Sequence, residues 1–296
     1  LYLLDGGISD ESYRRLLASW DTDRLELHVV LPDAKRLSDL KVSQHVNHLT
    51  YYRILLPELL PSSLGKVVYL DADLLIRRDI SELWDQPLDD SWALAAQDCA
   101  APFFDAAVAA ANFPKCRPYL AALRPIPNFR NLGLSPASPY FNGGVLAIDL
   151  DAWRRHELAD RMLACLRDNA EFVLWWDQYA LNVALEGHWR PMDPRWNQGA
   201  YLFEYPDWQR SPFDERVFHL LKDDPWIVHF SSPLKPWSSG SSHPYRMQFF
   251  ECLDRTDWRG LRPATWPHRR QLALRRLYRG LRAIKLRTPM ARLGMP

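Results

Sequence analysis

Short apolar runs alternate with amphipathic segments along most of the chain. Apolar runs of strand length lie at 1–5, 25–31, 66–70, 92–96, 141–150 and 225–230. Apolar residues recur at helical spacing over 48–60, 151–169 and 177–186, and Ser9 followed by two acidic residues begins a further helix. Strands that alternate with helices predict an α/β domain whose central sheet is mostly parallel.

Two segments show neither the spacing of a strand nor that of a helix. Residues 112–139 are rich in proline, and residues 231–244 are rich in Ser, Pro and Gly. An irregular segment as long as 112–139 inside a compact domain is usually functional or mobile. We therefore expect both segments to be loops.

The bulk composition is that of an ordinary globular protein, with 47% hydrophobic and 25% charged residues. The four cysteines are widely spaced, which predicts neither a structural zinc site nor a disulfide framework and favours a reducing, cytoplasmic environment. No apolar run reaches the roughly 18 residues of a membrane span. The chain starts within a predicted strand and without Met, so we expect the natural protein to extend upstream.

Charge divides the chain into two parts. From Arg259 to the C-terminus there are eleven Lys or Arg and no Asp or Glu, which leaves 26 basic against 36 acidic residues in 1–258. Within this tail, residues 268–287 predict a basic amphipathic helix, because Leu274, Leu277, Leu281 and Ile284 recur at steps of three and four. That pattern favours a peripheral contact with an anionic membrane surface. The alternative is a C-terminal helix that packs on the acidic body; nucleic acid is not an expected partner.

Two carboxylates follow the apolar run 66–70. Asp71 and Asp73 are one residue apart, so strand alternation predicts that both lie on one side of the strand's C-terminal edge. In open α/β sheets that edge binds ligands. Paired oxygen donors suit Mn²⁺ or Mg²⁺, which would carry the phosphates of a nucleotide. The alternative is that the pair only caps the next helix, but Asp79 already begins that helix.

Further polar residues lie where predicted elements begin or end. Asp98 and His229 end apolar strands, Asn142 opens one, and Asp177 and Gln178 begin a helix. Lys235 follows in the 231–244 loop. Each has an ordinary structural explanation: Asp177 as a helix cap, His229 as a core histidine, Lys235 as a surface charge. Their shared position at strand ends and element starts favours one common cleft.

Several motifs resemble glycosyltransferase family 8, in that family's order and spacing. The segments that carry the resemblance are 3–9, 47–53, 69–73, 79–84, 140–146, 177–182 and 229–237. Together they span roughly residues 1–250. The family includes bacterial lipopolysaccharide galactosyl- and glucosyltransferases and the glycogenins.

The resemblance implies a GT-A type fold and a retaining transfer of a hexose from a UDP-sugar to a glycan or glycolipid acceptor, such as lipopolysaccharide or another cell-surface glycan. It implies Mn²⁺ as the cofactor, with Mg²⁺ as the alternative, and Asp71, Asp73 and His229 as the metal ligands. The donor-binding residues that it implies are Arg53, Asp98, Asn142, Ser232 and Lys235, with Asp177 and Gln178 as catalytic residues. The family's first strand, which holds the uracil, has no counterpart in this sequence.

The sequence thus predicts a catalytic domain over 1–258, incomplete at its N-terminus, and a basic tail over 259–296. Two other functions stay open at this point. One is a relative that binds a nucleotide sugar and has lost activity. The other is a phosphohydrolase of the haloacid dehalogenase type, whose nucleophile also follows an apolar strand; Leu75 replaces the Thr or Val expected there.

Overall fold

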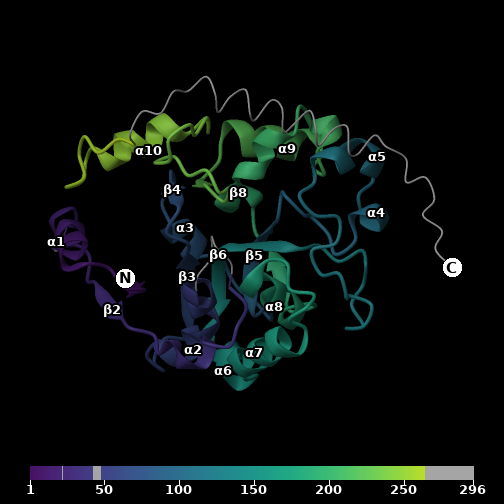
Figure 1. Ribbon diagram of the computed structural model, residues 1–296, viewed down its shortest axis with the longest axis horizontal. Helices are drawn as coiled ribbons and strands as arrows, with labels where there is room; N and C mark the ends of the chain where they lie inside the picture. The colour runs from purple at the N-terminus through teal and green to yellow at the C-terminus, as the bar shows by residue number, and fades with distance from the viewer. Residues whose placement is uncertain (22, 43–47, 264–296) are drawn as a thin grey trace.

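The computed structural model describes residues 1–21, 23–42 and 48–263. Its central feature is a four-stranded sheet, of which β3, β5 and β6 are labelled in Figure 1. The strand order is β3-β6-β5-β7. These strands are β3 (Lys66–Leu70), β5 (Ala93–Gln97), β6 (Phe141–Asp149) and β7 (Trp189–Pro191). β6 is buried along most of its length, as expected for a strand with both faces covered.

The predicted α/β fold is confirmed, with one correction to the sheet. Within the described strands of this sheet, β6 runs antiparallel to both of its neighbours, β3 and β5, and only β5 and β7 pair in parallel. The central sheet is therefore mixed and not mostly parallel. The long connection that contains the proline-rich segment brings the chain back beside β5 in the opposite direction.

Two smaller sheets flank the central one. β4 (Leu74–Ile76), β9 (Ile227–His229) and β8 (Gln198–Gly199) form a sheet in the order β4-β9-β8. β1 (Tyr2–Leu4) and β2 (His28–Val30) form a parallel pair, joined through α1 (Asp10–Ala18). The hydroxyl of Ser9 caps α1 by accepting from the Ser12 N–H, which confirms the predicted helix start.

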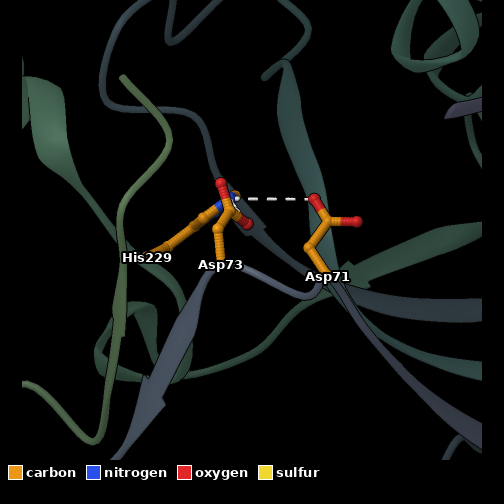
Figure 2. A group of neighbouring side chains, drawn as sticks. All are labelled: Asp71, Asp73 and His229. Atoms are coloured by element: carbon orange, nitrogen blue, oxygen red, sulfur yellow. Dashed lines mark ion pairs between the residues drawn. The ribbon is translucent and has the colours of Figure 1, made fainter. Parts of the chain in front are cut away.

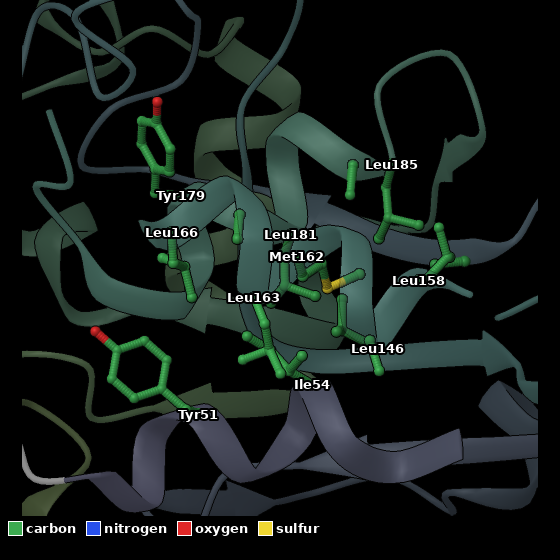
Figure 3. Packing of buried hydrophobic residues seen from close by; sticks show 14 of the residues in the cluster. Tyr51, Ile54, Leu146, Leu158, Met162, Leu163, Leu166, Tyr179, Leu181 and Leu185 are labelled. Carbon is green, nitrogen blue, oxygen red and sulfur yellow. The ribbon is translucent and has the colours of Figure 1, made fainter. Parts of the chain in front are cut away.

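The main core lies between the central sheet and a group of helices (Figure 3). The helical elements on this side are η2 (His48–Leu55), α2 (Leu56–Leu59), α6 (Leu150–Arg155), α7 (Leu158–Asp168) and α8 (Trp176–Ala184). Residues 48–60 form the predicted helical segment, but its first part is a 3₁₀ helix. The predicted helix 151–169 is instead two helices, because Glu157 adopts a left-handed conformation with φ 50°.

The proline-rich segment is ordered and packed. It contains α5 (Phe113–Cys116) and η3 (Arg117–Tyr119), and Cys116 and Leu120 belong to a second buried cluster with Phe218 and Leu221 of α9 (Glu215–Asp223). The predicted loop is found over 120–138, and only 113–119 form short helices; its apolar residues, although unevenly spaced, pack into a core. The remaining elements are η1 (Ala34–Leu37), α3 (Ser81–Trp84), α4 (Ala106–Ala109), η4 (Pro194–Asn197), η5 (Ala200–Glu204), η6 (Trp208–Arg210) and α10 (Arg246–Leu253).

The predicted basic helix 268–287 lies outside the described residues, as does nearly all of the 259–296 segment. In the part of the chain that is described, no helix combines the length and the apolar character needed to cross a membrane.

Candidate active site

Two carboxylates and an imidazole converge where the central sheet meets the β4-β9-β8 sheet (Figure 2). Asp71 and Asp73 lie in the turn between β3 and β4, and His229 is the last residue of β9, opposite Leu74. The ligand atoms of the three residues lie within 4.8 Å of one another. His229 Nε2 is 3.3 Å from Asp73 Oδ1 and 3.7 Å from Asp71 Oδ2.

The two aspartates are brought together by a turn and not by strand alternation. β3 ends at Leu70 and β4 begins at Leu74, so Asp71 and Asp73 belong to neither strand. The Asp71 N–H continues the β3–β6 ladder by donating to the Gly144 carbonyl at 2.8 Å. The predicted proximity of the two carboxylates therefore arises by a different local geometry from the one expected.

The cluster fits a divalent cation. A Cβ atom at Gly144 would lie 2.7 Å from His229 Nδ1 and 3.0 Å from Asp71 Oδ2, so glycine leaves the space that the imidazole needs. His229 is buried, and the two aspartates are partly exposed toward a cavity. Two carboxylate oxygens and one imidazole nitrogen form a donor set that Mn²⁺ accepts.

Lys235 lies against the same cluster. Its ammonium group donates to Asp73 Oδ2 and, at 2.7 Å, to the Phe230 carbonyl. Burial raises the pKa of Asp73, but hydrogen bonds and electrostatic attraction from His229 and Lys235 outweigh that effect and hold the pKa below its usual value. Asp73 is therefore ionised and available as a ligand at neutral pH.

Arg53 connects the cluster to the start of α8. Its Nε is 2.6 Å from Asp177 Oδ2 and its Nη2 is 3.3 Å from Asp71 Oδ1. Nη1 donates to the Gly143 carbonyl, and the guanidinium stacks over the Tyr69 ring at 4.7 Å from its centre. Arg53 is thus held by contacts at Nε, at both Nη nitrogens and over the Tyr69 ring, and it lines the cavity.

The buried pair affects the pKa of both partners. Burial raises the pKa of Asp177, and the attraction of Arg53 and a hydrogen bond from Thr50 Oγ1 at 2.6 Å only partly offset it. Burial lowers the pKa of Arg53, but the charges of Asp177 and Asp71 outweigh that effect and raise it. Asp177 also lies in the first turn of α8, where the helix dipole favours a negative charge.

A second polar group lies beside this pair. Asp98 Oδ2 accepts from Asn142 Nδ2 at 2.9 Å and from Gln178 Nε2 at 3.0 Å. Gln178 Oε1 in turn accepts from the Gly143 N–H at 3.1 Å. Both ends of the Gln178 amide are therefore engaged by the protein. The group presents an anchored carboxylate and two amides to the cavity, which suits the hydroxyl groups of a sugar.

These groups line one cavity of about 350 Å³. Three aromatic side chains line it as well: Trp175, Trp176 and Tyr201. Of the predicted site residues, those that line the cavity are Arg53, Asp71, Asp73, Asp98, Asn142, Asp177, Gln178 and His229. Lys235 is not among the lining residues, but it donates to Asp73, which lines the cavity.

Ser232 is placed differently. Its hydroxyl donates to the Leu234 carbonyl at 3.1 Å, and its neighbours Ser231 and Pro233 line the cavity instead. Its predicted contact with the donor stays a prediction.

Four residues that support the site were not among the predicted site residues. Thr50 supports Asp177, and the Tyr69 hydroxyl donates to Asp71 Oδ1 at 2.7 Å. Gly144 makes room for His229, and Asn197 hydrogen-bonds to the same imidazole at 2.9 Å. Thr50, Tyr69 and Gly144 fall inside motifs that carried the family resemblance, which was the available signal. Asn197 lies outside them, and nothing in its spacing distinguishes it.

Comparison with known proteins agrees with the fold. The profile described as Glycosyl transferase family 8 matches residues 1–240. General stress protein A of Bacillus subtilis (strain 168) is 27% identical over 261 residues, which cover 87% of this chain and 83% of that protein. Lipopolysaccharide 1,2-glucosyltransferase of Escherichia coli (strain K12) is 21% identical over 258 residues, covering 87% of this chain and 69% of that protein.

A solved structure supports the fold directly. The galactosyltransferase LgtC, in complex with donor and acceptor sugar analogs, superposes with a TM-score of 0.68 at 22% identity, covering 91% of this chain and 87% of that chain. The architecture is accordingly that of a GT-A type glycosyltransferase. The chain belongs to glycosyltransferase family 8.

Proposed function

We propose that this glycosyltransferase transfers a hexose from a UDP-sugar to a glycan acceptor, with retention at the anomeric carbon and with Mn²⁺ as cofactor. The observation that carries the proposal is the cluster of Asp71, Asp73 and His229, whose ligand atoms lie within 4.8 Å of one another at the edge of the cavity. Relatives named as lipopolysaccharide glucosyl- and galactosyltransferases support a lipopolysaccharide or similar cell-surface glycan as the acceptor.

In this proposal, the two aspartates and His229 Nε2 hold the cation. When bound, Mn²⁺ stabilises the negative charge that develops on the leaving diphosphate. Lys235 adds a second positive charge beside Asp73, which favours the same charged leaving group. Mg²⁺ is the alternative ion, because the carboxylates are hard donors, but the imidazole favours Mn²⁺.

The sugar of the donor lies, in this proposal, over Asp98, Asn142, Asp177 and Gln178. Gln178 occupies the position of a nucleophile on the sugar's β face, yet a neutral amide is a poor nucleophile. A displacement on one face is therefore the better mechanism: the bond from the anomeric carbon to the phosphate oxygen breaks as the bond to the acceptor oxygen forms. The acceptor's proton passes to the leaving phosphate.

Two alternatives are weaker. A phosphohydrolase of the haloacid dehalogenase type expects an acidic pair at a strand end, whereas Asp223 and Asp224 lie at the end of α9. Loss of activity in a nucleotide-sugar binder does not explain why all three proposed metal ligands, Asp71, Asp73 and His229, lie together in the described site.

The test is a donor screen with UDP-glucose, UDP-galactose and UDP-GlcNAc, each with Mn²⁺ and a lipopolysaccharide core acceptor. The proposal predicts UDP release and a new glycosidic bond whose anomeric configuration, read by NMR, matches that of the donor. Release of inorganic phosphate would support the phosphohydrolase, and absence of any turnover would support the binder. A product with inverted configuration would contradict the retaining mechanism.

From the sequence alone, we also propose that the basic tail binds an anionic membrane surface at the cytoplasmic face. Its support is the apolar and cationic pattern of 268–287. Sedimentation with phosphatidylglycerol-containing vesicles tests it: a 1–258 chain should lose binding that the 1–296 chain has. Equal binding by both chains would contradict a membrane role for the tail.

A further inference from the structure

Asn197 hydrogen-bonds to His229, one of the proposed metal ligands, and is not itself one of those ligands. It lies at the end of η4, is only 5% exposed, and its Oδ1 is 2.9 Å from His229 Nδ1. Its Nδ2 is 3.0 Å from Asn142 Oδ1 and 3.3 Å from the Asn142 carbonyl oxygen. The side chain thus bridges the sugar side of the cavity to the metal side.

Asp98, at the far end of this bridge, fixes which way the Asn142 side-chain amide points. The Asp98 carboxylate accepts from the backbone N–H groups of Ala100 and Ala101 and from the side chains of Asn142 and Gln178. An ionised carboxylate only accepts, so Asn142 must present its NH₂ group to Asp98. Its Oδ1 then faces the other way, where it accepts from the Gly144 N–H at 3.0 Å. A backbone N–H only donates, so the Asn142 amide is fixed from both sides.

The orientation of the Asn142 amide also fixes the orientation of the Asn197 amide beside the imidazole. Both atoms of Asn142 that face Asn197 are acceptors, so Asn197 must present its NH₂ group to them. Its Oδ1 is therefore the atom that faces His229 Nδ1. Since this oxygen only accepts, Nδ1 must carry a proton.

We propose that Asn197 is a positioning residue: by accepting from Nδ1–H it orients the His229 ring so that Nε2, and not Nδ1, faces the cation. Nε2 is the nitrogen that faces both carboxylates, at 3.3 Å from Asp73 Oδ1 and 3.7 Å from Asp71 Oδ2. An outer hydrogen bond of this kind fixes the ring orientation and the tautomer of a metal-bound histidine. The inference rests on the proposed metal site and adds a residue that no motif of the sequence indicated.

The test is direct titration of the metal-free protein with Mn²⁺, with free Mn²⁺ read by electron paramagnetic resonance. Asn197→Ala removes the acceptor and should weaken Mn²⁺ binding by roughly 10- to 100-fold. Asn197→Asp keeps an acceptor for Nδ1–H but places a carboxylate oxygen against the two acceptors of Asn142, so its Mn²⁺ affinity should lie between those of the wild type and Asn197→Ala.

Asn128→Ala is the matched control. Asn128 is also buried, but its amide bonds to Asn169 and to the Tyr179 hydroxyl, and none of these three residues lines the cavity. Its loss should lower thermal stability and leave Mn²⁺ affinity unchanged. Circular dichroism confirms that each variant is folded before titration.

The possible results distinguish a wrong positioning role for Asn197 from a wrong metal site. If folded Asn197→Ala binds Mn²⁺ like the wild type, or if Asn197→Asp loses as much affinity as Asn197→Ala, the positioning role is wrong while the metal site stands. If Asn128→Ala weakens Mn²⁺ binding equally, the effect is general destabilisation and the inference also fails. If the wild-type protein binds no Mn²⁺, the proposed metal site itself is wrong and this inference falls with it.

Discussion

Arg53 and Asp177, which both line the cavity, form an ion pair with 2.6 Å between Nε and Oδ2. The two side chains are 9% and 3% exposed. The same guanidinium reaches Asp71, one of the proposed metal ligands, so the pair couples the start of α8 to the metal side of the site.

Breaking this pair should destabilise the fold. Arg53→Met leaves Asp177 buried without its partner, which costs roughly 3–5 kcal/mol of unfolding free energy. The double variant Arg53→Met with Asp177→Asn should recover part of that loss, because the buried charge at position 177 is then removed as well; the partly exposed Asp71 still loses its contact with Arg53. Urea denaturation measures both. Arg36→Met is the control, since Arg36 pairs with Glu58 and Asp160 at the surface and should cost no more than about 1 kcal/mol. Equal losses at positions 53 and 36 would contradict the account.

Gly144→Ala should disrupt the metal cluster without unfolding the protein. The added methyl group would lie 2.7 Å from His229 Nδ1, so the imidazole must move away from the two carboxylates. Mn²⁺ affinity and transfer rate should each fall at least about tenfold. In the control Gly65→Ala, the new methyl group meets only the end of the Asp151 side chain, which is exposed and free to turn aside. Wild-type Mn²⁺ binding in Gly144→Ala would show that the space is not required.

Gln178 should not become covalently attached to the sugar. Both ends of its amide are already hydrogen-bonded, to Asp98 and to the Gly143 N–H. Gln178→Ala should therefore slow turnover yet still give product with retained configuration, whereas Asp177→Asn should slow it more by removing a charge that Arg53 holds in place. Product NMR and intact-protein mass spectrometry check this. A glycosylated residue trapped at 178 would overturn the assignment.

His243 should make stability sensitive to acid. Burial lowers its pKa from 6.5 to about 4, among the rings of Phe203, Phe230 and Tyr245. Below the unfolded pKa the unfolded chain binds a proton that the folded protein resists, so this residue lowers the unfolding free energy as pH falls from 6.5 toward about 4. His243→Phe removes the titrating group. Urea denaturation across that window should show a shallower decline in the variant; identical declines would rule the effect out.

The sequence predicted the order of elements better than their directions. Apolar runs mark β3, β5, β6 and β9, but a fully buried strand looks the same in either direction, so the antiparallel β6 was not foreseen. The break between α6 and α7 was also missed, because Glu157 is neither Gly nor Pro and gives no local signal.

The proximity of the site residues was predicted in part. Their position at strand ends predicted that Asp71, Asp73 and His229 share one cleft, and the structure places the three side chains together. The residues that support them act through long-range contacts: Asn197 lies 32 positions from His229, and Thr50 lies 127 positions from Asp177. Periodicity describes neighbours along one element, so contacts of that kind carry no pattern in the sequence.

The central claim is that transfer depends on a cation held by Asp71, Asp73 and His229. The most direct measurement follows UDP release from the UDP-sugar that the screen identifies, first with EDTA-treated protein and then after Mn²⁺ is restored. The account predicts no release in EDTA, recovery with Mn²⁺, and no recovery in Asp73→Asn, which should remain folded by circular dichroism. Undiminished UDP release by the EDTA-treated protein would contradict it.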